Sequence, residues 1–276
     1  MTGQQAAGDS SYPALAMREY FAGIWAARYF WMHLAAADLR SRWRRSFFGL
    51  LWCILQPVGL TLILAFVLSR LFHTDIRSYA PYIISGTLVW EFIMAVSVGG
   101  SLSFVQADAY IKYFRHPLAI YSLRTVLANL AVLAIASTSM YAWAAIVRPE
   151  RIGISWISAL SIYPLVALVA WPMSTLLAYA GSRFRDLPNV LALVMQAIWF
   201  ISPVYFEASM FRRGGLNNLV DYNPLYHLLQ IVRAPLLEGK WPSAADYEVC
   251  FGTALFFACC AWLVGRKVER KIIFYL

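Results

Sequence analysis

The sequence predicts an all-α integral membrane protein with six transmembrane helices. It also predicts an N-terminal amphipathic helix at the membrane interface and short re-entrant external helices between spans five and six. Apolar residues make up 61% of the 276 residues and charged residues 13%, whereas a soluble domain carries about 25% charged residues. An arginine-rich segment at 38–45 leads into a long stretch that is apolar, apart from Gln56, as far as Ser69. Such a cluster typically anchors a first span whose N-terminal side is cytoplasmic.

The region before the first span divides into two parts. We expect a flexible N-terminus at 1–16 and an amphipathic interface helix at 17–48. Aromatic and aliphatic residues recur there at spacings of three and four, and basic residues gather at its end, as in helices that lie in a membrane interface. A partner-binding helix is an alternative that is compatible with this position. The residues at these spacings are Tyr20, Ile24, Ala27 and Trp31, and in a second set Trp25, Tyr29, Met32 and Ala36.

Six segments are apolar enough to be considered as spans, since a helix needs about 20 such residues to cross the hydrocarbon core. The second segment holds Glu91 near its middle, and the fifth is short and stops near Pro203. Lys and Arg are more numerous on the predicted cytoplasmic side, which favours both termini inside. We expect the spans at about 49–71, 80–104, 118–147, 156–180, 190–204 and 250–264.

The segment from about 205 to 247 is too polar to span a membrane, yet it contains apolar pieces separated by RRGG and by Pro224 and Pro235. Short helices that dip into the outer leaflet fit this pattern, because irregular backbone at membrane depth must pack in protein or line a wet cavity. An ordinary external loop with amphipathic turns fits equally well.

The net charge of +9 is explained by basic residues beside apolar spans, so we expect membrane lipids rather than nucleic acid as partners. The four cysteines lie in or beside apolar segments without CxxC spacing, and we interpret them as core residues rather than metal ligands. No G-x-x-x-x-G-K-[ST] motif is present, so the chain is not expected to bind a nucleotide.

Several motifs follow one another along nearly the whole chain. The arginine-rich segment leads into Ser46, Gly49, Trp52 and Pro57. GTLVWEF, YIKYFRHP, FRDLPN, ISPVYF and NPLYHLL come later, in that order. Together these motifs resemble the permease subunit of ABC-2-type polysaccharide exporters. The chain departs from that family at Glu91, where an uncharged polar residue is common, and at His116, where an aromatic residue is common.

The resemblance implies a homodimer of six-span subunits that encloses a channel in the bacterial inner membrane, with 49–276 as the ABC-2 transmembrane domain. It implies two separate ATPase subunits that use ATP and Mg²⁺, while this chain itself binds no cofactor. The implied substrate is a lipid-linked polysaccharide such as O-antigen, and the implied activity is transport, without catalytic or metal-binding residues.

Other classes of protein stay open on the sequence. An ABC-2 exporter of a small lipophilic compound would share the fold. A membrane-embedded glycan-modifying enzyme is disfavoured, because the four histidines are scattered without catalytic spacing. A channel or secondary transporter is disfavoured by the lack of a persuasive internal repeat.

Three groups of candidate site residues follow. The resemblance implies a coupling helix at 108–116 that docks on the ATPase, with a second cytoplasmic loop beside it. The coupling candidates are Asp108, Tyr110, Ile111, Lys112, Tyr113, Phe114, Arg115, Arg185 and Asp186. Aromatic side chains can stack on sugars, so we expect a channel lined from Tyr82, Trp90, Glu91, Phe104, Trp171, Tyr179, Trp199 and Tyr205. A lipid headgroup or pyrophosphate is a candidate ligand near Arg40, Arg42, Arg44 and Arg45, but anchoring of the first span is sufficient to explain these arginines and is the favoured interpretation. The pair Arg185–Asp186 also fits a local ion pair within its loop.

Overall fold

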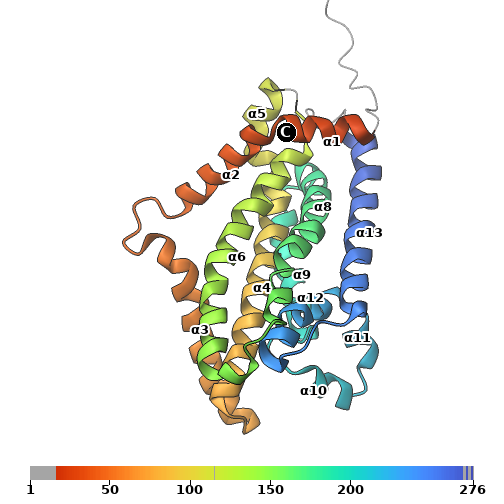
Figure 1. Cartoon of the computed structure of the whole chain (residues 1–276). Helices are drawn as coiled ribbons and strands as arrows, with labels where there is room; N and C mark the ends of the chain where they lie inside the picture. Colours follow the sequence, from red (N-terminus) through yellow and green to blue (C-terminus); the bar gives the residue numbers. More distant parts are fainter. Residues whose placement is uncertain (1–16, 115, 270–271, 273–274, 276) are drawn as a thin grey trace, which may run out of the picture.

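The computed structural model describes residues 17–114, 116–269, 272 and 275, which fold into helices joined by turns (Figure 1). The expectations for 1–16 and for Arg115 lie outside these residues. No β-strand occurs within the described ranges, so the predicted all-α class is confirmed. The helices are α1 (Met17–Ala26), α2 (Arg28–Arg42), α3 (Trp52–Phe72), α4 (Ile76–Leu102), α5 (Asp108–Tyr113), α6 (Ala119–Val147), α7 (Trp156–Ala159), α8 (Ile162–Arg183), α9 (Leu187–Ile201), α10 (Ala208–Arg213), α11 (Asn217–Asp221), α12 (Pro224–Arg233) and α13 (Ala244–Val268).

Five helical segments of the described chain are long and apolar enough to cross a membrane. The predicted fifth span corresponds to α9, which has 15 residues and is therefore about 22 Å long, short of a hydrocarbon core of about 30 Å. The expected count of six spans is thus not confirmed, because α9 ends at Ile201 and the chain turns at Ser202 and Pro203. The five segments are Gly49–Phe72, Tyr79–Leu102, Ala119–Val147, Trp156–Arg183 and Ala244–Val268.

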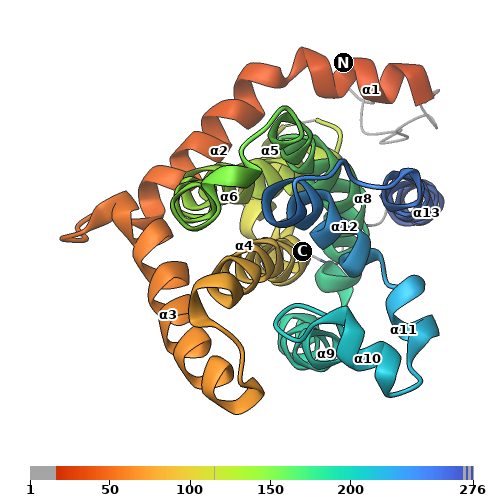
Figure 2. The same cartoon turned by 60° about the horizontal axis from the view of Figure 1, so that its bottom comes forward.

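Helix α4 occupies the centre of the bundle, where it contacts α3, α6, α8 and α9 (Figure 2). Small residues allow α4 and α8 to approach closely. A Cβ added at Gly181 of α8 would lie 1.9 Å from the backbone oxygen of Ser101 of α4. Helices in membranes commonly use small residues in this way, since close backbone approach increases their van der Waals contact.

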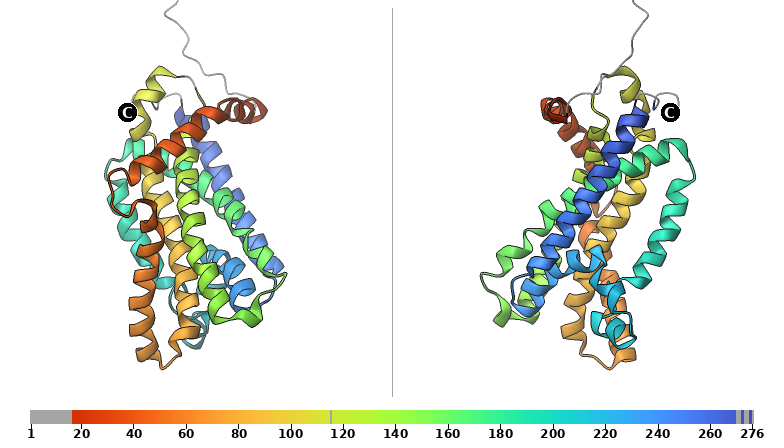
Figure 3. Two further views of the ribbon diagram at one scale, coloured as in Figure 1. Left: turned by 60° about the vertical axis from the view of Figure 1, so that its left-hand side comes forward. Right: turned by 90° about the vertical axis from the view of Figure 1, so that its right-hand side faces the viewer.

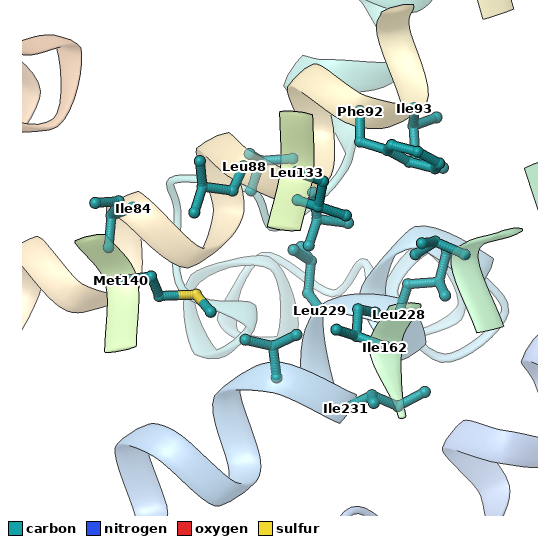
Figure 4. Packing of buried hydrophobic residues seen from close by; sticks show 14 of the residues in the cluster. Ile84, Leu88, Phe92, Ile93, Leu133, Met140, Ile162, Leu228, Leu229 and Ile231 are labelled. Carbon is teal, nitrogen blue, oxygen red and sulfur yellow. The ribbon is translucent and has the colours of Figure 1, made fainter. Parts of the chain in front are cut away.

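The main apolar core lies between α4, α6, α8 and α12 (Figure 4). It lies nearer the end of the bundle that carries α12, and a second cluster around Tyr121 and Phe104 lies at the end that carries α5. We refer to these ends as the α12 end and the α5 end. Labelled members of the main core include Ile84, Leu88, Phe92, Leu133, Met140 and Leu229.

The predicted interface helix is present as two helices that cross the α5 end (Figures 1 and 3). The helix breaks at Ala27 and stops at Arg42, and turns follow before α3. Ile24 and Ala35 are buried, whereas Trp25 and Tyr29 are more than half exposed. One of the two apolar sets therefore faces the bundle, and the other faces away from it.

The segment between α9 and α13 is more deeply packed than a surface loop. Helix α12 contacts α4, α7, α8 and α13, while α10 and α11 lie at the edge of the α12 end (Figure 3). Apolar side chains of α12 point into the main core, and the following π-helical turn, Ala234–Glu238, extends this packing. Burial in protein is the condition under which such a segment can enter a membrane, so entry of the re-entrant helices into the bilayer stays a prediction. The buried residues of α12 include Leu225, Leu228, Leu229, Ile231 and Val232.

Candidate functional site

Helix α5 projects beyond the bundle and carries exposed aromatic side chains. Tyr113 is 84% exposed and Phe114 is 50% exposed, although Ile111 is buried in the second apolar cluster. Lys112 Nζ donates to Asp108 Oδ2 at 2.9 Å, which pairs two charges one turn apart. Exposed apolar side chains that gather in this way are typical of an interaction surface.

The aromatic face of α5 is supported from α2. The ring of Phe30 lies 5.9 Å from that of Tyr110, 6.0 Å from that of Phe114 and 5.0 Å from that of His116. These separations are typical of aromatic contacts. Helix α5 therefore packs against α2 through the ring of Phe30.

The second predicted coupling element lies at the turn between α8 and α9. Arg185 and Asp186 are both exposed there. No ion pair joins them or links either to another described residue, so the predicted local pair is not formed. The backbone oxygen of Asp186 accepts from the amides of Asn189 and Val190 instead, and so begins α9.

The channel candidates separate into two groups that are far apart along the bundle. Five of them gather around α4 and the end of α9. The rings of Trp199 and Tyr205 are 5.0 Å apart, and the Thr87 hydroxyl donates to the Tyr205 hydroxyl at 3.4 Å. Glu91 is half-buried and forms no hydrogen bond or ion pair among the described residues. This group comprises Tyr82, Trp90, Glu91, Trp199 and Tyr205.

The other three candidates, Phe104, Trp171 and Tyr179, lie near the α5 end. Phe104 is fully buried, and its ring packs edge-on against that of Tyr179 at 5.2 Å. Trp171 Nε1 donates to the backbone oxygen of Ala119 at 3.0 Å, which ties α8 to the start of α6. Within a single chain, Phe104 and Tyr179 are therefore core residues.

The predicted headgroup arginines differ in their surroundings. Arg40, Arg42, Arg44 and Arg45 are all exposed, but only Arg42 contacts another helix by a side-chain hydrogen bond among the described residues. Arg42 Nη1 donates to Asn129 Oδ1 on α6 at 3.1 Å, so this side chain has a structural partner.

One turn before Arg42 on α2, Asp38 forms an ion pair with the buried Arg124 of α6. The distance between Asp38 Oδ2 and Arg124 Nε is 3.2 Å. The end of α2 is thus fastened to α6 at two points. Arg44 and Arg45 lie beyond it in exposed turns, and their contact with a lipid headgroup stays a prediction.

Sequence reasoning missed a buried arginine at the α12 end. Arg233, the last residue of α12, is 3% exposed. Its Nη1 donates to the oxygen of Pro203 at 2.7 Å, its Nη2 to those of Tyr82 and Val204, and its Nε to Ser85 Oγ at 3.2 Å. The guanidinium also lies 3.6 Å from the centroid of the Tyr82 ring, at cation–π distance.

Arg233 therefore joins three segments that are remote in sequence, namely α12, α4 and the turn after α9. The signal was present as a lone cation in the apolar stretch PLYHLLQIVRAPLL. Its partners could not be inferred, because three of the four acceptors are backbone oxygens. We call Arg233 and its four acceptor groups the arginine clamp.

The turn that receives this guanidinium is also held from α4. The Tyr79 hydroxyl donates to the oxygen of Tyr205, and the Tyr82 hydroxyl donates to that of Phe206 at 2.9 Å. Gly86 is needed for this approach, because a Cβ there would lie 2.3 Å from the Val204 oxygen and 2.7 Å from Arg233 Nη2.

A second polar contact fixes α12 to α13. His227 Nδ1 lies 2.8 Å from Asp246 Oδ1, and its Nε2 lies 2.9 Å from the oxygen of Asp221. Asp246 also completes a capping box with Ser243 at the start of α13. The imidazole of His227 thus links the end of α11 to the start of α13.

Comparison with known proteins gives distant relatives over most of the chain. An O-antigen export system permease protein RfbA of Klebsiella pneumoniae is 21% identical over 207 residues, covering 73% of this chain and 78% of that protein. An RfbA of Myxococcus xanthus is 24% identical over 246 residues, covering 86% and 90%. The polysialic acid transport protein KpsM of Escherichia coli is 22% identical over 208 residues, covering 73% and 79%.

No protein-family model matches the chain. The predicted resemblance to polysaccharide export permeases is nevertheless confirmed by these relatives.

Proposed function

We propose, from this relationship to O-antigen and polysaccharide export permeases, that the chain is the transmembrane subunit of an ATP-driven exporter. The exporter works as a homodimer and moves a lipid-linked polysaccharide across the bacterial inner membrane. ATP and Mg²⁺ are used by two separate ATPase subunits. The observation that carries the proposal is that relatives named as O-antigen export permeases or as a polysialic acid transport protein align with at least 73% of the chain.

The α5 end supports contact with a cytoplasmic motor. Tyr113 and Phe114 present apolar area outside the bundle, and the Asp108–Lys112 pair adds charge beside it. Lipid does not explain aromatic rings on a helix that projects beyond the ends of the spans (Figure 1). We assign this surface to the ATPase, with the α8–α9 turn that carries Arg185 and Asp186 as a second contact. Both termini then lie in the cytoplasm.

The side of the bundle formed by α3 and α9 supports pairing with a second copy. Both helices contact α4 and carry large exposed apolar side chains, among them Leu62, Ile63, Phe66 and Leu193. Trp90, Glu91 and Trp199 lie near this side. A homodimer formed there would bring the two copies of this channel group toward a shared path, in which α9 completes its crossing within the assembly.

Export requires the substrate to pass an outer boundary, and the arginine clamp suits that position. It fixes the turn after α9 and the end of α12 to the start of α4. We assign 202–238 to the outer gate of the exporter. The exposed arginines Arg40, Arg44 and Arg45 lie at the opposite end, where the pyrophosphate of a lipid carrier would be received.

The test is export of the polysaccharide in a strain that lacks the gene for this chain. We expect surface polysaccharide to disappear, to return with the wild-type gene, and to require the partner ATPase. Accumulation of lipid-linked glycan inside the cell would accompany the loss. Unchanged surface polysaccharide in the deletion strain, or restoration without the ATPase, would refute the proposal.

A matched pair of variants tests the coupling surface. Tyr113→Ala removes an exposed ring from α5, whereas Tyr222→Ala removes an 81% exposed ring at the α12 end. We expect Tyr113→Ala to reduce both co-purification of the ATPase and export at an unchanged protein level, and Tyr222→Ala to leave ATPase co-purification intact. Equal recovery of the ATPase with both variants would remove α5 from the interface.

A further inference from the structure

A long groove runs between α1, α8 and α13, on a different side of the bundle from the channel group. Its volume is about 620 Å³, within the range of about 300–1,000 Å³ usual for ligand pockets. Its walls are mostly apolar, with Leu168 and Trp171 from α8 and Phe251, Leu255 and Trp262 from α13. No side chain of the described residues fills this space.

Helix α1 covers the groove at the α5 end. The rings of Tyr20 and Trp262 are 5.8 Å apart, and those of Phe21 and Trp171 are 6.4 Å apart. Lining residues extend from Leu168 to Tyr179 along α8, which corresponds to about 17 Å at the rise of an α-helix. On α13 the lining residues extend from Phe251 to Arg266, about 22 Å. The groove therefore reaches through more than half of a hydrocarbon core of about 30 Å and covers at least the depth of one leaflet.

The end of the groove beneath α1 is polar. Arg266 lies on its rim, is exposed, and pairs with no acidic side chain among the described residues. Glu269 also lines this end, where its Oε1 accepts from the Leu118 amide at 3.4 Å. Burial raises the pKa of the Glu269 carboxyl, which weakens its repulsion of an anion.

An apolar groove at least one leaflet deep, with a free cation at its interfacial end, is complementary to a phospholipid. We propose that this groove holds one glycerophospholipid from the leaflet at the α5 end, with its phosphate at Arg266 and an acyl chain between α8 and α13. The phosphate meets a guanidinium, and the chain meets apolar walls that open toward the surrounding lipid. The proposal assigns Trp171 and Tyr179, which were predicted from the sequence as channel residues, to the lining of this lipid site. It does not depend on the exported substrate.

Such a lipid has a structural consequence. Its acyl chain would touch α1, α8 and α13 at once, and so would join the interface helix to two membrane helices where direct contact between them is incomplete. The packing of α1 against α8 and α13 consequently depends on the bound lipid.

The test uses the full chain with its partner subunits in nanodiscs that contain phosphatidylglycerol with a diazirine on one acyl chain. After photolysis, mass spectrometry locates the labelled peptides. We expect groove peptides from α8 and α13 to be labelled above α3 peptides that contain Leu62, Ile63 and Phe66, although those three side chains are more than half exposed. Labelling that simply follows exposure, or an unlabelled groove beside a labelled α3, would overturn the proposal.

Matched variants separate the groove from general lipid contact. Ala258→Trp places a large ring in the groove and should suppress labelling of α8, whereas Ala134→Trp, at an exposed position of α6, should not. Arg266→Gln removes the positive charge while keeping a polar side chain of similar reach, and tests the phosphate contact without filling the groove. Because one cation near the headgroups contributes about 1 kcal/mol, it should weaken apparent lipid affinity about fivefold.

Competition identifies the lipid. Unlabelled phosphatidylglycerol should displace the probe from the groove peptides, while an equal amount of a polyprenyl phosphate should displace it no better. If the polyprenyl phosphate alone competes, the phospholipid is the wrong occupant. Equal labelling in wild type, Ala258→Trp and Arg266→Gln would likewise contradict the site.

Discussion

Replacement of Arg233 by methionine is the sharpest test of the arginine clamp. Methionine keeps an unbranched apolar stem but removes every donor, so the oxygens of Pro203 and Val204 lose charge-assisted hydrogen bonds inside the protein. Net hydrogen bonds to charged groups contribute about 1.5–3 kcal/mol each. Two such losses lower the free energy of unfolding by about 3–6 kcal/mol, a large part of the margin of a folded domain.

The two other contacts of Arg233 are expected to add little. The Tyr82 oxygen also accepts from Ser85 Oγ, which can keep that bond, and Ser85 Oγ is 3.2 Å from the guanidinium. Arg233→Lys retains the positive charge but cannot reach all the acceptors at once, because an ammonium is compact and lacks the planar fork. The free energy of unfolding of Arg233→Lys should therefore lie between those of the wild type and Arg233→Met.

The assay is thermal unfolding of the purified protein in one detergent, followed by tryptophan fluorescence, with limited proteolysis of the segment between α9 and α12. Arg213→Met is the matched control, since Arg213 is exposed on α10 and pairs with no described acidic residue. We expect Arg233→Met to lower Tm strongly and to expose the segment, and the control to do neither. Equal Tm values for Arg233→Met and Arg213→Met would refute the clamp.

Three other substitutions test neighbouring parts of the structure. Gly86→Ala should reproduce the instability of Arg233→Met, because its Cβ would meet Val204 and the guanidinium. The control Gly59→Ala, which has open space around it, should leave Tm nearly unchanged. Similar Tm values for the two variants would contradict the close approach at Gly86. Asp38→Asn should lower the free energy of unfolding by about 1 kcal/mol, the upper range for a partly exposed ion pair. It should also reduce hydrogen-exchange protection of the α2 amides, whereas Arg44→Gln should not. Unchanged protection of α2 in Asp38→Asn would exclude a role of Asp38 in holding α2 on α6. Burial raises the pKa of Glu269, so folding favours its protonated form, and the contribution of this group is lost as pH rises above its ordinary value of about 4.5. Melting curves between pH 5 and about 8 should therefore show wild type losing stability relative to Glu269→Gln as pH rises, and parallel pH profiles would contradict that sign.

The sequence was sufficient to place the long helices, because apolar residues continue far enough to identify a helix in lipid without knowledge of its neighbours. The predicted 49–71 and 118–147 agree closely with Gly49–Phe72 and Ala119–Val147. The interface helix was less accessible, since the break at Ala27 has no proline or glycine to mark it. The shortness of α9 was visible, but whether 15 residues cross a bilayer depends on what surrounds them.

Among the candidate site residues, the sequence could single out only those whose residue type is unusual for an exposed position. Tyr113 and Phe114 stand out because aromatic residues on a short polar link need a reason to be there. The channel residues could not be ranked, because an aromatic ring that lines a path and one that fills a core have the same sequence signature. Phe104 belongs to the second kind within one chain, and only packing against Tyr179 reveals it.

The polar contacts divide the chain into two mechanical units joined by α4. At the α5 end, Phe30 links α5 to α2, and Asp38 and Arg42 fasten α2 to α6. At the α12 end, the arginine clamp fastens α12 and the turn after α9 to α4.

Helix α3 belongs to neither unit by polar contact, because the residues between Arg42 and its first turn are mostly exposed and Arg45 adopts a left-handed φ of 70°. We therefore expect a displacement of α5 to move α2 and α6 together and to reach the segment at the α12 end through α4. We expect any relative movement between α2 and α3 to occur at this exposed link before α3. The arginine-rich segment at 38–45 thus anchors α2 to α6 through Asp38 and Arg42, while Arg44 and Arg45 at its end are exposed.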